Sequence, residues 1–482
     1  MTFRARIRAS LRASVVASVV AVMCAPRLPA DEISVRGLTQ DEERAIASIQ
    51  TGAVLGTVSF LASDEMAGRD TPSPELTLAT AYVSARFRGA GLAGLGPDGS
   101  FYQTHEYVQS VPPATPGVLT VDNREVPLLG ALFGAVRAGL LEGELSAESA
   151  DTTAARIVVV DAPELPPQAA ERPASALAAV ARMVQPLQRN GAIAALVRCS
   201  SDSPLRSLPG RIRDRPARLP AELRPQIPVI LVDESVQLSG HGRLQTTAQE
   251  TLIAEVRNVI GVLRGSDPQL SGEAIVISAH LDHIGRLDGD RGGDTINNGA
   301  DDNATGVTAV ITLADAFARL PQPPARSVIF MTFWGEEKGL LGSRAYCDDP
   351  LWPLEKTVAN INIEMIGRPA EGAESKAWGT GWTRSSLCDQ LAAGALRAGV
   401  QIFHREDVSE MLYTRSDNYA FVDRGVIAHS ISAGSLHSDY HQPTDEVSRL
   451  NIPHMTKVIQ GLFAASLPLA AGELTPVKTP SE

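Results

Sequence analysis

Apolar runs that alternate with amphipathic segments from residue 251 onward constrain the fold more than any other feature of the sequence. EAIVISAH and SVIFMTFW contain few polar residues, as expected for strands buried on both faces of a sheet. Between them, VTAVITLADAFARL repeats apolar residues at helical spacing. Further strand candidates are VRNVIGVLRG and VANINIEMIG, and SLCDQLAAGALRAG is a further helix candidate. This alternation predicts a layered α/β domain with a largely buried sheet.

The residues before 251 have a different character. Segments 40–56 and 75–90 carry apolar residues at helical spacing, with the polar loop FLASDEMAGRDTPS between them. Residues 111–250 are rich in Pro and Ala, and their short strand-like runs predict a small inserted α/β or β-rich module. The expected elements of this module are strands at 155–162, 192–199 and 227–234, a helix at ASALAAVARMVQPL and a loop at 201–226.

The first thirty residues are predicted to be a signal peptide. Four arginines precede an apolar stretch from Ala13 to Ala25, and a small residue ends the segment. The mature chain is then expected to begin near Asp31 and to be exported to the periplasm or the extracellular space. Lipoprotein anchoring at Cys24 is disfavoured because Met23 precedes it, and no apolar stretch approaches the roughly 20 residues of a membrane span.

Charge and cysteine content narrow the function classes. The formal net charge is −12, and the only Lys/Arg-rich stretch after the signal is the short one from Arg211 to Arg218, which argues against nucleic acid as a partner. Beyond the signal the cysteines are Cys199, Cys347 and Cys388, an odd number without metal-type spacing. One disulfide is possible, whereas a disulfide framework is excluded.

Carboxylates and imidazoles gather where the predicted strands of the α/β domain end. The groups are His280 with Asp282, Asp301 with Asp302, Glu336 with Glu337, Glu364 alone, and His437 with His441. In such sheets, functional residues lie at the carboxyl ends of the strands. Burying so many charges as unrelated pairs is costly, so a shared cation is the simpler explanation. Ligands of these types without thiolates suit zinc, and the surplus of carboxylates suits two ions that share one carboxylate.

The order of the motifs resembles that of the co-catalytic di-zinc aminopeptidase family, which includes secreted bacterial leucyl aminopeptidases and glutamate-carboxypeptidase-like exopeptidases. The motifs are H-x-D, G-A-D-D-N-A-[ST]-G, E-E-x-G-L-x-G-S, a carboxylate before M-[IV]-G, and Y-H-x-P-x-D. The similarity is dense over 251–465 and looser over 45–105. It implies a three-layer α/β domain with a central mixed, mostly parallel sheet flanked by helices. The implied parts are the two halves of the peptidase domain (31–110 and 251–470), an insert similar to a protease-associated (PA) domain (111–250) and a C-terminal tail (471–482).

The resemblance implies two zinc sites that share one carboxylate. Asp302 would bridge the two ions, His280 and Glu364 would complete one site, and Glu337 and His441 would complete the other. The family usually has an aspartate before M-[IV]-G, and the longer Glu364 changes the reach and angle of its carboxylate. Whether the His280 site is occupied is therefore left open.

The resemblance also implies hydrolysis of peptides by a water that bridges the two ions. Glu336 would be the general base that takes its proton, Asp282 would hold His280, and Tyr413 would stabilise the oxyanion. Asp417 is expected to shape the loop of Tyr413. The other histidines are expected to be structural (His283, His429 and His454) or the weaker ligand candidate of their motif (His437).

The predicted function is a secreted zinc-dependent exopeptidase, an aminopeptidase that removes N-terminal residues from peptides. A single-zinc acyltransferase similar to glutaminyl cyclase is one alternative, and the presence of ligands for both sites disfavours it. A non-catalytic binding protein on the same fold is another, disfavoured because Glu336 and the ligands are all present. Side-chain specificity, oligomeric state and the choice between aminopeptidase, dipeptidase and carboxypeptidase stay open.

Overall fold

The computed structural model describes residues 30, 32–147, 156–165, 173–214, 219, 223–236, 239–287, 293–434 and 436–479. The predicted signal peptide, apart from residue 30, lies outside these residues, as does Cys24. The described helices include none with the length and apolar character needed to cross a membrane. Cys199, Cys347 and Cys388 are buried and form no disulfide among the described residues.

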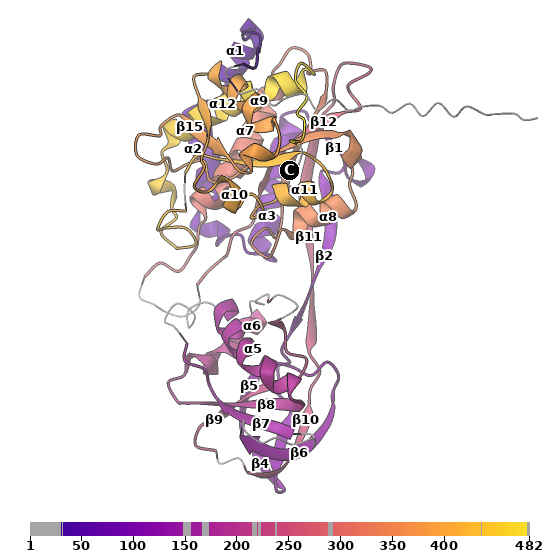
Figure 1. The fold of residues 1–482 in the computed structure, drawn as a ribbon, viewed down its shortest axis with the longest axis vertical. Helices are drawn as coiled ribbons and strands as arrows, with labels where there is room; N and C mark the ends of the chain where they lie inside the picture. The colour runs from indigo at the N-terminus through magenta and orange to yellow at the C-terminus, as the bar shows by residue number, and fades with distance from the viewer. Residues whose placement is uncertain are drawn as a thin grey trace, which may run out of the picture.

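A mixed sheet forms the centre of the larger body in Figure 1. Its strands are β1 (Ala93–Gly94), β2 (Tyr102–Val111), β11 (Glu250–Leu263), β12 (Ala274–His280), β13 (Ser327–Phe333), β14 (Thr357–Ile363), β15 (Lys376–Gly379), β16 (Gln401–His404) and β17 (Ala428–Ser432). Their order is β1-β11-β13-β12-β14-β17-β15-β16, and β2 also pairs with β11. The central pairings from β13 through β12 and β14 to β17 are parallel, whereas β11 pairs antiparallel with each of its neighbours. The sheet is therefore mixed, as predicted, with parallel pairs at its centre and one further parallel pair, β15 with β16, at its edge.

Helices cover both faces of this sheet and produce the expected three layers. One face packs against α1 (Gln40–Ala47), α2 (Thr51–Leu61), α3 (Pro74–Gly89), α7 (Gly306–Ala318), α9 (Leu387–Leu396) and α12 (Ile452–Ala470). The other face packs against α8 (Leu341–Asp348) and α11 (Asn418–Asp423). The short helix α10 (Ser409–Leu412) lies between β16 and α11 in the chain.

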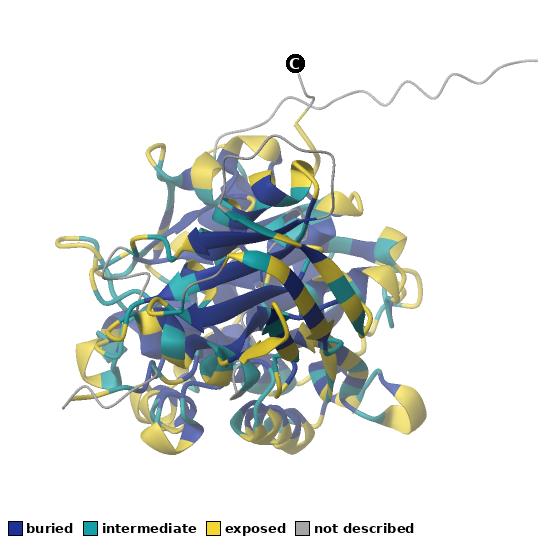
Figure 2. Ribbon diagram, turned by 90° about the horizontal axis from the view of Figure 1, so that it is seen from below, coloured by how far each residue is buried: buried dark blue, intermediate teal, exposed yellow. Residues whose placement is uncertain are grey.

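Strand β12 shows why its sequence is apolar without alternation. Ile275 and Ile277 belong to the core on one face, whereas Ala274 and Val276 belong to the core on the other. Successive side chains of a strand point to opposite faces, so a strand covered on both sides needs apolar residues at every position. Figure 2, seen from the side of the smaller module, shows buried strand segments in dark blue near the centre and exposed segments in yellow toward the rim.

A second sheet forms a smaller module within the predicted insert. Its strands are β3 (Val118–Val121), β4 (Arg124–Val126), β5 (Leu128–Phe133), β6 (Gly139–Ala147), β7 (Arg156–Asp161), β8 (Ala192–Cys199), β9 (Val229–Asp233) and β10 (Gly240–Thr246). Helices α5 (Pro173–Arg189) and α6 (Leu208–Asp214) pack on one of its faces. The long antiparallel ribbon of β2 and β11 connects this module to the larger body (Figure 1).

The structure corrects two expectations about helices. Residues 40–56 form parts of α1 and α2 rather than one continuous helix, because Gln50 is extended and the Ser48 hydroxyl donates back to the Ala45 carbonyl at 2.7 Å. The expected loop 201–226 contains α6, which buries Leu208 and Ile212 against α5 and its sheet. These two residues are four apart, a helical spacing that the prolines of the segment conceal.

Phe317 of α7 packs between the helices on one face of the central sheet and the sheet itself. Its replacement measures how much this packing contributes to stability. Its ring centroid lies 4.8 Å from that of Phe463 and 6.0 Å from that of Phe330. Phe317→Ala is expected to destabilise this domain by about 3–5 kcal/mol through the lost burial and the cavity. All four tryptophans lie between residues 334 and 382, so urea unfolding followed by tryptophan fluorescence reports on this domain. Leu78→Ala, at a side chain that is 51% exposed, is the control and is expected to change stability little.

Candidate metal centre

The five predicted ligands come from separate segments that meet at one edge of the central sheet. His280 ends β12, Glu337 follows β13 and Glu364 follows β14. Asp302 lies in the turn that leads into α7, and His441 lies in the loop after β17. Because the central strands are parallel, their carboxyl ends share one edge of the sheet. Sequence positions more than 150 residues apart are thereby brought into contact.

The first group consists of His280, Asp302 and Glu364. The His280 Nε2 atom lies 3.2 Å from Asp302 Oδ1 and 3.4 Å from Glu364 Oε2. The other oxygen of Glu364 accepts hydrogen bonds from the Asn362 amide, at 3.2 Å, and from the Ser416 hydroxyl. These two donors orient the carboxylate toward His280, so the extra methylene of Glu364 does not take it out of the group.

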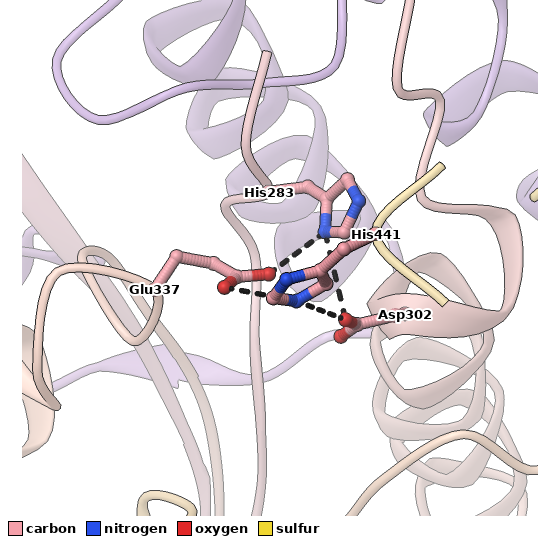
Figure 3. A group of neighbouring side chains, drawn as sticks. All are labelled: His283, Asp302, Glu337 and His441. Carbon is pink, nitrogen blue, oxygen red and sulfur yellow. Dashed lines mark ion pairs between the residues drawn. The ribbon is translucent and has the colours of Figure 1, made fainter. Parts of the chain in front are cut away.

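The second group consists of His283, Asp302, Glu337 and His441 (Figure 3). The His441 Nε2 atom lies 3.1 Å from Asp302 Oδ2 and 3.2 Å from Glu337 Oε2. The His283 Nδ1 atom lies 2.8 Å from Glu337 Oε1 and 3.7 Å from Asp302 Oδ2. The two oxygens of Asp302 thus face different groups, which is the arrangement of a shared carboxylate. His283, expected to be only structural, lies inside the group.

The electrostatics of both groups favour positive charge. Burial by itself lowers the pKa of His280 and His441, but the surrounding carboxylates raise the pKa of His280 well above its usual value and that of His441 to about 10. Burial acts in the opposite direction on the carboxyls, yet contacts with the histidines hold the pKa of Asp302 well below its usual value and that of Glu337 at about 2. Protons on the histidines therefore compensate the carboxylates here, and a divalent cation would supply the same compensation.

Asp282 connects the first ligand to the predicted general base. The Nδ1 atom of His280 lies 3.0 Å from the backbone carbonyl of Asp282 and 3.7 Å from its carboxylate. The carboxylate itself accepts from the Thr71 hydroxyl at 2.9 Å and from the backbone N–H of Glu336 at 3.1 Å. The predicted support of His280 thus comes mainly from the backbone of Asp282, and its side chain holds the loop of Glu336.

Glu336 itself lies beside both groups without belonging to either. Burial raises the pKa of Glu336 well above its usual value, and the nearby Glu337, Asp417 and Glu364 carboxylates add to this effect against the opposing influence of His280. A raised pKa suits a carboxylate that accepts and returns a proton near neutral pH.

Arg69 is a buried cation behind the metal-binding loops, and the sequence analysis missed it within the polar loop FLASDEMAGRDTPS. Its guanidinium donates to the carbonyls of Leu281 at 2.9 Å, Asn298 at 2.8 Å and Gly299 at 3.1 Å, and also to that of Leu61. Burial lowers the pKa of Arg69 to about 10, so it stays charged at neutral pH. No sequence signal marks this role, because the carbonyls it binds come from distant segments.

The loop that carries His441 is tied to the loop that carries Asp302. The Asp445 carboxylate accepts from the backbone N–H groups of Asp301 and Asp302, each at 3.1 Å. His437 Nε2 lies 3.3 Å from Asp301 Oδ2, which places His437 in this structural contact and outside both ligand groups. His429 and His454 also lie outside them: they contact the Ser385 hydroxyl and the Ser375 backbone N–H, respectively.

Two tyrosines differ in their distance from the ligands. Tyr413, the predicted oxyanion donor, has its ring centroid 6.2 Å from that of Tyr419 and 5.5 Å from that of His429, and neither of these residues belongs to a ligand group. Tyr440 stacks on the ring of His441 with centroids 3.9 Å apart. Burial and the site carboxylates raise its pKa. The role of Tyr413 stays a prediction, and Tyr440 is a neighbour of the site that sequence reasoning missed.

Asp417, expected to shape the Tyr413 loop, is completely buried at the start of α11. Burial raises its pKa to about 7, with the negative charges of Glu364 and Asp282 adding to the effect.

A cavity of about 700 Å³ opens beside Glu337. Its lining includes Trp334 and Lys338, which are close to Glu337 in the sequence, and Tyr107 of β2. Leu219 and Arg224 of the smaller module also reach this cavity. Both bodies of the molecule therefore contribute walls to the space next to the second group.

Similarity to known proteins covers the segment that carries the site. Residues 258–465 match the sequence profile of Peptidase family M28, which confirms the family resemblance that the motifs of this segment predict. The chain is 24% identical over 225 residues to a vacuolar membrane protease of Lachancea thermotolerans, covering 45% of this chain and 21% of the relative. It is 22% identical over 201 residues to aminopeptidase YwaD of Bacillus subtilis, covering 40% of each chain. The chain thus spans well under two thirds of the length of these relatives.

A solved structure resembles the fold of the whole chain. The zinc aminopeptidase BSAP from Bacillus subtilis superposes with a TM-score of 0.52 at 15% identity, covering 89% of this chain and 97% of that one. At this identity the likeness concerns the fold, and it agrees with the α/β architecture described above.

Replacing Arg69 tests whether its buried guanidinium stabilises the loops that carry His280 and Asp302. Arg69→Met keeps the length of the side chain but leaves four carbonyls without their donor, so we expect a loss of about 3–5 kcal/mol in stability. Zinc affinity is expected to fall as well, because Arg69 contacts the loops that carry His280 and Asp302. Thermal unfolding and zinc titration against a chelating indicator would measure the two effects. Arg319→Met, at an exposed arginine, is the control, and equal behaviour of the two variants would contradict the role.

Proposed function

Because residues 258–465 carry the sequence of Peptidase family M28, we propose that the protein is a zinc-dependent exopeptidase, most specifically an aminopeptidase that hydrolyses N-terminal residues of peptides. The observation that carries the proposal is Asp302, whose two carboxylate oxygens face two separate histidine and carboxylate groups. A pair of ions bridged by one carboxylate explains that arrangement, and unrelated ion pairs do not.

The residues present fit zinc. Imidazole nitrogens and carboxylate oxygens are its usual ligands in catalytic sites. The His283 Nδ1 and Glu337 Oε1 atoms are buried and have no hydrogen-bond partner among the described residues, as expected of atoms that would contact an ion. His280, Asp302 and Glu364 would hold one ion, and Asp302, Glu337 and His441 the other. Zinc bound there would polarise the scissile carbonyl and lower the pKa of water.

Glu336 would move the proton in this reaction. Its backbone is fixed by Asp282 at 3.1 Å, and its raised pKa lets it accept a proton from water and return it to the leaving amine. Glu337 points into the ligand group instead. The two adjacent glutamates would therefore divide the work, one carrying the proton and the other holding the ion.

The cavity beside Glu337 would admit the peptide. Its walls come from the larger body and from Leu219 and Arg224 of the smaller module, so that module, a PA-like insert at 111–250, would help to shape the substrate entrance. The domain boundaries at 31–110 and 251–470 and export by a signal peptide at 1–30 belong to the same proposal.

Glu336→Gln separates proton transfer from metal binding. The amide cannot accept the proton, so turnover of short peptides is expected to fall by about 100-fold to 10,000-fold, while zinc per chain stays that of the unmodified protein. Peptides with free and with acetylated N-termini should be compared, since an aminopeptidase cleaves only the former. Glu355→Gln, at an exposed glutamate, is the control. Near-full activity of Glu336→Gln would refute its assignment as the base.

Zinc content tests the two-ion site directly. After loading with excess zinc and gel filtration, elemental mass spectrometry is expected to give about two ions per chain, and removal by a chelator is expected to abolish hydrolysis until zinc is restored. A value near one would locate the defect at the His280 and Glu364 position and would favour a single-zinc, glutaminyl-cyclase-like activity. A value near zero would refute the metallopeptidase proposal.

A further inference from the structure

His283 is placed as a ligand would be, although it lies outside the expected set. Its side chain is completely buried, and its Nδ1 atom lies 2.8 Å from Glu337 Oε1 and 3.7 Å from Asp302 Oδ2. Its ring stands at 74° to that of His441, with centroids 5.4 Å apart. Figure 3 shows the two imidazoles and the two carboxylates directed toward one another around a common centre.

The distances from the two histidine nitrogens to the carboxylate oxygens of this group are those expected between ligands of one zinc ion. Zinc bonds of about 2.0 Å to nitrogen and oxygen place tetrahedral ligand atoms about 3.3 Å apart. The two histidine nitrogens lie 3.7 and 3.1 Å from Asp302 Oδ2, and 2.8 and 3.2 Å from the Oε1 and Oε2 atoms of Glu337, respectively, and these distances scatter around that value. A histidine that merely packed against the site would not need its nitrogen at this distance from two carboxylates.

The contact between His283 and Glu337 is not a hydrogen bond. The two atoms are 2.8 Å apart, yet neither His283 Nδ1 nor Glu337 Oε1 has a hydrogen-bond partner among the described residues. Two lone pairs directed at a shared point, rather than at each other, would give this combination of short distance and poor alignment. An ion at that point would satisfy both atoms.

The backbone keeps the His283 ring in place. Its N–H donates to the Arg69 carbonyl at 3.2 Å, and the ring lies against Gly299, where a Cβ atom would come within 2.5 Å of His283 Cγ. Gly299 also has φ of +59°, a conformation that favours glycine. The close approach of Gly299 therefore leaves the room that His283 occupies beside Asp302.

We infer that His283 is a fourth protein ligand, which makes the two ion positions chemically unequal. The position of His283, Asp302, Glu337 and His441 is closed by four protein ligands, as in sites that retain zinc firmly. The position of His280, Asp302 and Glu364 has three protein ligands and stays open, as in sites that exchange a ligand during catalysis. This inference rests on the proposed zinc-dependent function: the closed position holds the resident ion, and the open position loses its ion first.

A matched pair of variants tests the order in which the two zinc ions are lost. In the unmodified protein, dialysis against increasing chelator is expected to remove one zinc well before the other. His280→Ala is expected to keep the tightly held ion, whereas His283→Ala is expected to weaken it by more than about 100-fold, a larger loss than removal of an outer contact causes. Thermal unfolding of the zinc-free variants shows whether each still folds. A tight ion that survives in His283→Ala but not in His280→Ala would overturn the inference.

X-ray absorption on the unmodified protein gives a second test that needs no variant. With one zinc per chain, the fitted shell is expected to contain two imidazoles, because the closed position includes both His283 and His441. One imidazole would overturn the inference even where the protein hydrolyses peptides and binds two ions. Failure to bind zinc at all would instead refute the proposed function, so the two failures are distinguishable.

Discussion

Negative charge buried at the edge of the sheet is the constraint on which the rest of the structure depends. Asp302 and Glu337 are nearly enclosed, with side chains only 5% and 7% exposed. Isolated carboxylates at such depth would be too costly to ionise. His280, His441, the guanidinium of Arg69 and, in the proposed function, two zinc ions compensate them. The site is therefore stable only when positive charge is brought to it from several parts of the chain.

The loops around the site are held by side chains from distant segments of the chain. Arg69 binds carbonyls from the loop after β12 and from the loop before α7, while Asp445 binds the backbone of the latter loop from the opposite direction. Gly68 allows the N-terminal segment to approach, since a Cβ there would come within 2.4 Å of the Asn297 carbonyl. The N-terminal residues thus complete a site whose ligands all come from the second half of the chain.

The smaller module is attached through a ribbon that also borders the cavity beside the site. The β2 and β11 ribbon extends the central sheet toward the module, and the same β2 strand lines the cavity beside Glu337. A module carried on such a ribbon contributes side chains to the cavity without contributing a ligand. In the proposed exopeptidase, the catalytic residues would all come from the larger body, whereas both bodies would shape the path of the substrate to them.

The main strands and helices of the larger body, and the polar residues at the ends of its strands, could be predicted from local sequence because each depends on short-range pattern, whereas α6 could not. The runs of β12 and β13 are mostly apolar without alternation and buried at every position, as expected of a doubly covered strand. His280 ends β12, whereas Glu337 and Glu364 follow shortly after β13 and β14. Tertiary structure alone decided the place of His283 and Arg69. Whether His283 points into a site or into the core depends on the turn after β12 and on the room beside Gly299, and the partners of Arg69 are backbone carbonyls, which carry no signature in a sequence. Local pattern determines which segments end at the site, whereas the groups that face one another there are set by contacts between segments distant in the sequence, such as His441 with Asp302 and Arg69 with Leu281.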